Sequence, residues 1–214
     1  MPLFHKSRSK YENSHSESNN SSSTYTHQFE HNVTRPKFDC QLAHGSRTHH
    51  ISGFKSTKEL YESIAQTFEI PVSEILFCTL NSYRLDMSKL LGNQVAYDDM
   101  IFAHVKGTKK EVELIKESET LGLTVTDNGA GFVFIKRVKP EGFMAHQMTS
   151  SNKAMVEVGD HIEKIDGYDF VGKKHLEVAM YLRNLPLGSR FILRLISPHQ
   201  SEFGKSGDEF LAEM

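Results

Sequence analysis

The chain has 214 residues, enough for one or two domains, and its 38% of hydrophobic residues suffices for packed cores. Its formal net charge of −2 argues against nucleic acid as a partner, because binding to phosphates needs a strong excess of basic residues. No apolar run approaches the ~20 residues that span a bilayer, so no membrane insertion is expected. The isolated cysteines, Cys40 and Cys78, favour a reducing compartment over a disulfide framework or a zinc site.

The N-terminal segment, residues 1–35, is rich in Ser, Asn and His. It has too few apolar residues to offset the entropy lost on ordering, and we expect a disordered tail. Beyond it, an alternating pattern predicts a strand that carries Phe38, Cys40 and Leu42. A second strand is expected at residues 51–54, so the segment opens like a hairpin.

A helix is predicted next, because Ser56-Thr57-Lys58-Glu59 is a capping box. Ser56 is expected to accept from the early helix N–H groups, and Glu59 to accept from the Ser56 N–H. The helix should end at Pro71. A buried strand at 75–80, a short helix at 86–91 and a strand at 100–105 complete residues 36–106. This order of elements resembles a ubiquitin-like β-grasp fold.

A polar connector is predicted at 106–110, followed by a second domain at 110–198. Asn128-Gly129 is expected to supply two positive-φ residues for a tight hairpin turn. A short helical corner should begin at 140–142, and residues 199–214 are expected to form a flexible tail. The strands and helices predicted for this domain are strands 112–115, 121–126, 132–138, 162–165 and 191–196, with a helix at 175–185.

Two short motifs in this second domain resemble those of PDZ domains. They are Leu121-Gly122-Leu123 and the run from Gly159-Asp160 to Gly167. The resemblance implies an α+β chain in which the β-grasp segment precedes a partly open β-barrel or sandwich with two helices. It also implies a groove that captures a peptide's free carboxyl end by strand addition.

Longer segments resemble the GIPC (synectin) family of PDZ adaptors, and the resemblance covers about 35–197. They are Gln41-Leu42-Ala43-His44-Gly45-Ser46, Phe77-Cys78-Thr79-Leu80-Asn81, Ile101-Phe102-Ala103-His104-Val105-Lys106-Gly107 and Leu121 to Gly131. The family's N-terminal homology segment takes part in dimerisation, which implies self-association through residues 36–106. The resemblance does not extend to myosin VI binding, because the sequence stops soon after the expected PDZ domain and the family's C-terminal homology domain is expected to be absent.

The expected peptide site has three parts. Backbone N–H groups of Leu121, Gly122 and Leu123 would bind the ligand's carboxylate, with Lys116 adding a water-bridged positive charge. Lys116 could equally be an ordinary solvated lysine. His175 would accept a hydrogen bond from a Ser or Thr hydroxyl two residues before the ligand's end. The third part is the strand together with an apolar pocket for the ligand's last side chain, and the pocket residues could equally be ordinary core. The residues expected there are Leu123, Thr124, Val125, Ala179 and Leu182.

These features predict a non-enzymatic cytoplasmic adaptor without cofactors or metals. It would bind the C-terminal tails of transmembrane receptors and signalling proteins and so cluster receptors. The family resemblance further implies a role in endocytic trafficking near vesicles or the plasma membrane. A rival hypothesis places the function in the β-grasp segment, which would bind a small GTPase or a ubiquitin-like surface.

Gly204-Lys205-Ser206 resembles the end of a P-loop, but His199 stands where that motif needs glycine.

Overall fold

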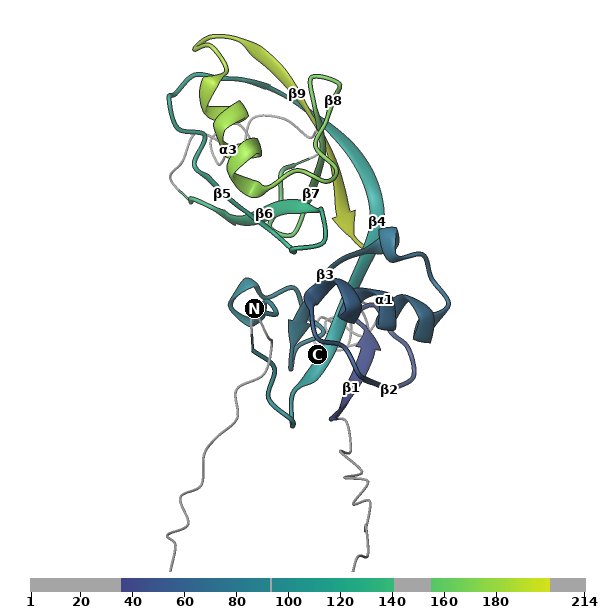
Figure 1. Cartoon of the computed structure of the whole chain (residues 1–214). Helices are drawn as coiled ribbons and strands as arrows, with labels where there is room; N and C mark the ends of the chain where they lie inside the picture. Colours follow the sequence, from purple (N-terminus) through teal and green to yellow (C-terminus); the bar gives the residue numbers. More distant parts are fainter. Residues whose placement is uncertain (1–35, 93, 141–154, 201–214) are drawn as a thin grey trace, which may run out of the picture.

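The computed structural model describes residues 36–92, 94–140 and 155–200. These residues form two halves joined by one long strand, β4 (Met100–Ile115), which runs through both (Figure 1). The tails predicted at 1–35 and 201–214 and the helical corner predicted after Pro140 lie outside the described residues. In the described part, no helix is both long enough and apolar enough to cross a membrane.

The N-terminal half confirms the predicted β-grasp fold. Strand β1 pairs antiparallel with β2 and parallel with β4, and β3 pairs antiparallel with the other side of β4. Helix α1 packs its buried residues, among them Leu60 and Ile64, into a core that includes both cysteines, which are free. The bounds are β1 (Lys37–Leu42), β2 (His49–Ser52), α1 (Thr57–Phe68), η1 (Val72–Glu74), β3 (Ile75–Leu80) and η2 (Met87–Lys89).

Helix α1 begins at the predicted cap, with one difference in its hydrogen bonds. The Ser56 side chain accepts from the N–H of Glu59 at 3.2 Å. The carboxylate of Glu59 reaches back to the N–H of Lys55, at 2.8 Å, rather than to that of Ser56. The helix ends before the predicted stop at Pro71, because Glu69 takes a left-handed conformation (φ 55°) and caps it.

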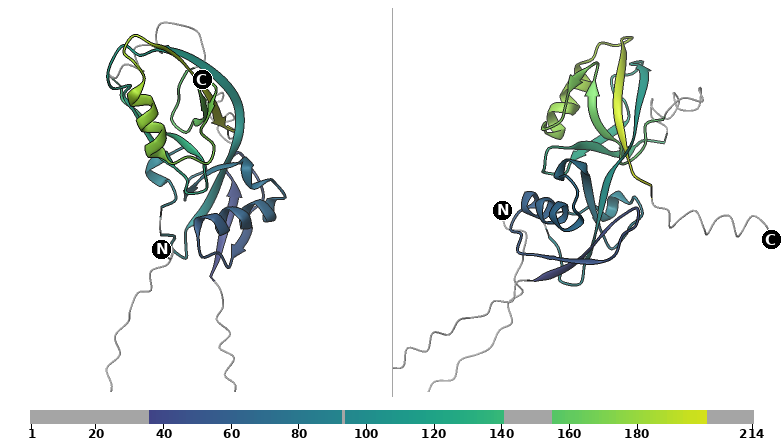
Figure 2. Two further views of the ribbon diagram at one scale, coloured as in Figure 1. Left: turned by 45° about the horizontal axis from the view of Figure 1, so that its top comes forward. Right: turned by 90° about the vertical axis from the view of Figure 1, so that its right-hand side faces the viewer.

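The C-terminal half is a twisted antiparallel sheet with α3 packed on one side (Figure 2). Its strands follow the order β4-β9-β7-β6-β5, so β5 is an edge strand. The core lies between the sheet and α3 and includes Val178, Leu193 and Leu195, all fully buried. The bounds are β5 (Leu123–Asp127), β6 (Val133–Val138), β7 (His161–Ile165), β8 (Tyr168–Asp169), α3 (His175–Asn184) and β9 (Arg190–Pro198).

The predicted polar connector at 106–110 is wrong, because these residues form the middle of β4. Their polar side chains find partners in the second half. Lys110, whose side chain is only 12% exposed, lies 2.6 Å from a carboxylate oxygen of Glu157 and 3.0 Å from one of Asp160. Lys109 lies 3.1 Å from Glu163. A polar run can therefore be a structured strand when distant residues neutralise its charges.

A small third core joins the two halves. It contains Leu76 and Phe77 from β3 and Phe134 from β6, all fully buried. The rings of Phe77 and Phe134 are stacked, with centroids 4.7 Å apart and an interplanar angle of 30°. The side-chain amide of Asn128, beyond β5, also donates to the carbonyl of Leu76 at 2.7 Å. The halves are thus fixed to each other by packing and by hydrogen bonding.

Asn128 corrects a second prediction. Only Gly129 and Gly131 have positive φ in the β5–β6 connection, so Asn128-Gly129 is not the expected positive-φ pair. Instead the Asn128 side chain accepts from the N–H groups of Ala130 and Phe132, at 2.8 and 3.0 Å. The turn is therefore longer than a two-residue hairpin, and the Asn128 side chain stabilises it together with the backbone bond from Asn128 N–H to the carbonyl of Phe132, at 3.0 Å.

His104 in β4 is buried, at 3% exposure, and its ring stacks on that of Phe77. Its Nε2 lies 2.9 Å from the hydroxyl of Thr79, which donates to the carbonyl of Ser82 at 2.6 Å. Because that hydroxyl proton is already used, Nε2 of His104 must donate to the Thr79 oxygen. Burial, aided by the nearby His44, lowers the pKa of His104 from 6.5 to about 4.

We expect the pKa of His104 to make the protein less stable in mild acid. The unfolded state takes up a proton near pH 6.5, whereas folded His104 stays neutral until about pH 4. Stability is therefore lost as pH falls below 6.5, by about 2 kcal/mol between pH 7.5 and pH 5. Urea unfolding of the wild type and of His104→Gln, which keeps a donor for Thr79, measures this loss. Equal pH dependence in the two proteins would contradict it.

Candidate functional site

The edge strand β5 and the helix α3 face each other in the C-terminal half. One edge of β5 pairs with β6, and its other edge has no strand partner in the part of the chain that the structure describes. An unpaired strand edge offers backbone N–H and C=O groups to an added strand. The space between β5 and α3 is therefore the place where an extended peptide could bind.

The loop before β5 combines a left-handed glycine with backbone N–H groups that point away from the sheet pairing. Gly122 has φ 73°, a conformation that strains other residues, and its carbonyl accepts the N–H of Lys139 at 2.9 Å. Within the described ranges, no hydrogen bond is found for the N–H of Leu121 or of Gly122. Together with the N–H of Leu123, these donors suit a carboxylate.

Apolar side chains from both elements pack in or against the core beside this space. Leu123 and Val125 of β5 are partly buried against the core of this half, and Leu182 of α3 is 6% exposed. Ala179, half-buried, keeps the helix face shallow between His175 and Leu182. Thr124 is exposed between Leu123 and Val125, so its side chain points away from the core.

His175 is the first residue of α3, as predicted, and its side chain is 43% exposed. Its ring nitrogen Nδ1 lies 2.5 Å from Oδ2 of Asp127, the last residue of β5. The sequence interpretation missed Asp127. The sequence shows an acidic residue just after the predicted strand. No local pattern indicates that this residue contacts the start of a helix 48 residues later.

Lys116 does not have the predicted role. Its side chain is 2% exposed, so it is neither a solvated lysine nor a cation open to the ligand. The ammonium lies at the C-terminal end of α3 and donates to three carbonyls, those of Leu182 (3.2 Å), Arg183 (2.5 Å) and Leu185 (2.7 Å). These bonds use all three ammonium protons, so none is left for a water on a ligand. Lys116 therefore holds the C-terminal end of α3.

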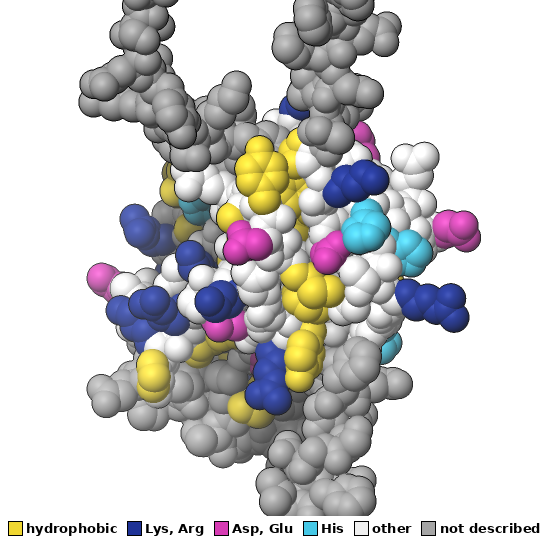
Figure 3. Space-filling model, turned by 90° about the horizontal axis from the view of Figure 1, so that it is seen from below, with side chains coloured by type: hydrophobic (Ala, Val, Ile, Leu, Met, Phe, Trp, Pro, Cys, Tyr) yellow, Lys and Arg dark blue, Asp and Glu magenta, His cyan; other side chains and the backbone are white. Residues whose placement is uncertain are grey.

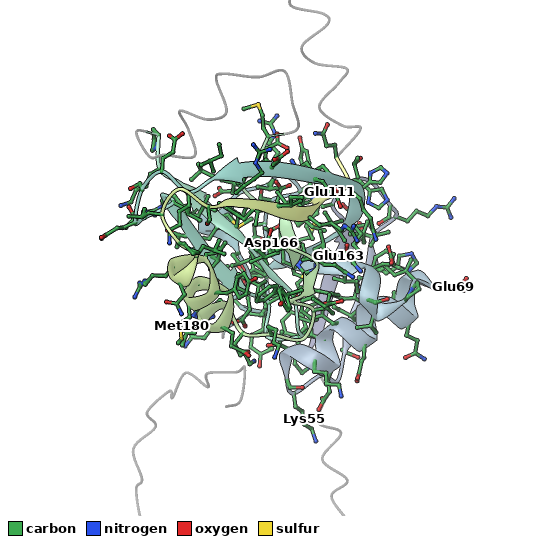
Figure 4. The ribbon with its side chains drawn as sticks, turned by 90° about the horizontal axis from the view of Figure 1, so that it is seen from above. Lys55, Glu69, Glu111, Glu163, Asp166 and Met180 are labelled. Carbon is green, nitrogen blue, oxygen red and sulfur yellow. The ribbon has the colours of Figure 1, made fainter. Side chains whose placement is uncertain are left out.

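Metal sites and other binding surfaces have little support in the described part of the chain. No cluster of metal-ligating side chains occurs in residues 36–92, 94–140 and 155–200. The end of the N-terminal half carries side chains of both charges and isolated apolar groups (Figure 3). The exposed apolar residue Met180 lies on the outer side of α3, away from the sheet (Figure 4).

An edge strand, a glycine loop at its start and a helix opposite it define the C-terminal half as a PDZ domain, as the sequence predicted. The N-terminal half matches the family model described as the GIPC1-3 GH1 domain, over residues 37–103.

Relatives extend this match across most of the described chain. The mouse (Mus musculus) PDZ domain-containing protein GIPC1 is 50% identical over 169 residues, which are 78% of this chain and 49% of that protein. Mouse GIPC3 is 52% identical over 169 residues, with 78% and 55% covered. The chain therefore belongs to the GIPC family. It spans about half the length of these curated relatives.

Solved structures with similar sequences include a PDZ domain of a choanoflagellate GIPC bound to a GAIP peptide. That domain is 44% identical, and the match covers 45% of this chain and 97% of the domain, with a TM-score of 0.40. The same domain bound to a B1AR peptide is 45% identical, with the same coverage and TM-score.

The predicted domain boundaries, 36–106 and 110–198, stay predictions, and so does the rival GTPase or ubiquitin-like-surface role of the β-grasp half.

Proposed function

We propose that this protein is an adaptor that binds the free C-termini of other proteins ending Ser/Thr-x-apolar. The observation that carries the proposal is the arrangement of Gly122, β5 and His175 around a strand edge that has no partner among the described strands. A peptide would add to β5 as an extra strand, and its backbone would supply much of the affinity.

Each part of the groove would then have one task. The N–H groups of Leu121, Gly122 and Leu123 bind the terminal carboxylate, which strengthens those hydrogen bonds because it is charged. Leu123, Val125, Ala179 and Leu182 take up the last, apolar side chain. His175 accepts from the Ser or Thr hydroxyl two residues before the end.

The partners we propose are the cytoplasmic tails of transmembrane receptors and of signalling proteins. Such an adaptor would cluster receptors and take part in endocytic trafficking, at the cytoplasmic side of endocytic vesicles or the plasma membrane. Membership of the GIPC family supports this proposal, and the chain's own net charge of −2 is consistent with protein rather than lipid partners.

A peptide with a free carboxylate should bind with micromolar affinity, or about −8 kcal/mol. The same peptide with an amidated end keeps its side chains but loses the charge that the Gly122 loop binds. We expect amidation to weaken binding about 10- to 100-fold, because a charge-assisted hydrogen bond contributes about 1.5–3 kcal/mol. Calorimetry with both forms of one peptide ending Ser/Thr-x-Val tests the proposal. Equal affinities would exclude carboxylate capture.

We also propose that residues 36–106 mediate self-association. Two protomers could exchange a strand or helix of this half if residues 106–110 opened, but opening would break the pairing of Lys109 and Lys110 with β9. A contact between two folded N-terminal halves is therefore the simpler form of dimer. Light scattering on the purified protein at tens of micromolar should then give the mass of a dimer. A monomer mass at that concentration would remove this proposal and leave the peptide site untouched.

A further inference from the structure

Asp127 joins the end of β5 to the start of α3. Its Oδ2 lies 2.5 Å from Nδ1 of His175 and accepts the backbone N–H of His175 at 3.1 Å. Its Oδ1 accepts the N–H of Gly129, also at 3.1 Å. The Asp127 side chain is only 15% exposed. Both oxygens are thus occupied by donors, and the carboxylate is fixed in one orientation.

The protonation state of this pair follows from its contacts. Burial raises the pKa of Asp127, but the hydrogen bonds from the ring and backbone of His175 and from Gly129 outweigh burial and leave the pKa below its usual value. Asp127 is therefore ionised at neutral pH, and a carboxylate can only accept. The proton between the two side chains belongs to Nδ1 of His175. In the neutral ring, Nε2 is then an acceptor.

The turn that carries Asp127 is itself held from the other half of the molecule. The next residue, Asn128, is 8% exposed and donates to the carbonyl of Leu76 in β3 at 2.7 Å. Its oxygen accepts the N–H groups of Ala130 and Phe132. The turn that positions the carboxylate is therefore held by hydrogen bonds to β3 and within the turn itself.

We infer that Asp127 is a positioning residue, which keeps His175 in the tautomer with its proton on Nδ1 and so makes the groove select a ligand hydroxyl. This inference rests on the proposed function. An acceptor at Nε2 lets the hydroxyl of Thr donate to the ring, which the methyl group of Val, of nearly the same shape, cannot do. Without Asp127, His175 is free to change its tautomer and its rotamer, and the distinction between the two ligands fades.

The test combines a ligand-free spectrum with a pair of peptides. Nitrogen-15 NMR of the His175 ring in the ligand-free protein should show the proton on Nδ1. Calorimetry should show that a peptide with Thr two residues before its end binds about 3- to 10-fold more tightly than its Val analogue. In Asp127→Ala, the proton should move toward Nε2, and the preference should fall to within about twofold, mainly through weaker binding of the Thr peptide.

Asp169→Ala is the matched control. Asp169 accepts the N–H of Val171, two residues on, at 2.8 Å, as Asp127 accepts that of Gly129, but it lies on β8. Both readouts should stay as in the wild type. A proton on Nε2 in the wild type, no Thr preference there, or an unchanged preference in Asp127→Ala would overturn the inference. If no peptide binds, the proposed function fails, while the spectrum still decides whether Asp127 orients His175.

Discussion

Phe77→Ala is expected to lower the free energy of unfolding by about 3–5 kcal/mol, because it removes a fully buried aromatic side chain and leaves a cavity. The cavity would open where the two halves meet, since Phe77 stacks on Phe134 at 4.7 Å. We therefore expect the halves to unfold less cooperatively in this variant. Urea unfolding gives the loss in stability, and hydrogen exchange of α1 and α3 reports on each half.

Phe191→Ala separates this coupling from a general loss of stability. Phe191 is equally buried, at 1% exposure, but it belongs to the core of the C-terminal half alone. Its loss should cost a similar free energy, of about 3–5 kcal/mol. Protection of α1 should then change less than in Phe77→Ala. If both variants alter α1 and α3 alike, the contact between Phe77 and Phe134 does not couple the halves.

Lys116→Met should lower stability by about 2–4 kcal/mol, because it leaves three carbonyls at the end of α3 without their donor. Methionine has a similar length, so the change mainly removes hydrogen bonds rather than volume. Because Leu182 lies at this end of the helix, peptide affinity should also fall. Chemical denaturation and calorimetry measure the two effects.

Lys136→Met is a suitable control for Lys116→Met, since Lys136 lies exposed on β6. An exposed substitution of this kind should change stability by no more than about 0.5 kcal/mol. If Lys116→Met were as stable as this control, the hydrogen bonds of the Lys116 ammonium would make no net contribution to the free energy of unfolding.

Local patterns predicted much of the architecture. The cap at Ser56 marked the start of α1 correctly, because N-capping depends on residues a few positions apart. The start of α3 at His175 and the loop at Gly122 were also found, since they belong to short motifs. The end of α1 was misplaced, because the left-handed Glu69 has no strong sequence signal.

The errors share a physical cause, which is contact between residues distant in the sequence. Lys110 looked like part of a solvated linker, yet its partners Glu157 and Asp160 lie about fifty residues further along. Lys116 looked like a ligand-facing cation, but α3 brings carbonyls to it from residues 182–185. Periodicity reports which face of an element is buried, and it does not report which charge or carbonyl will lie opposite.

The continuity of β4 restricts how this protein can change in evolution or by engineering. Flexible links between domains usually tolerate insertions and deletions, because the ends can still reach each other. In β4, adding or removing one residue between Lys109 and Val112, beyond the irregular pairing with β9 at Lys106–Lys109, would turn every following side chain to the opposite face of the sheet. Val112 and Leu114 would then leave the core. Length variation should therefore be absent from this segment, however polar its sequence.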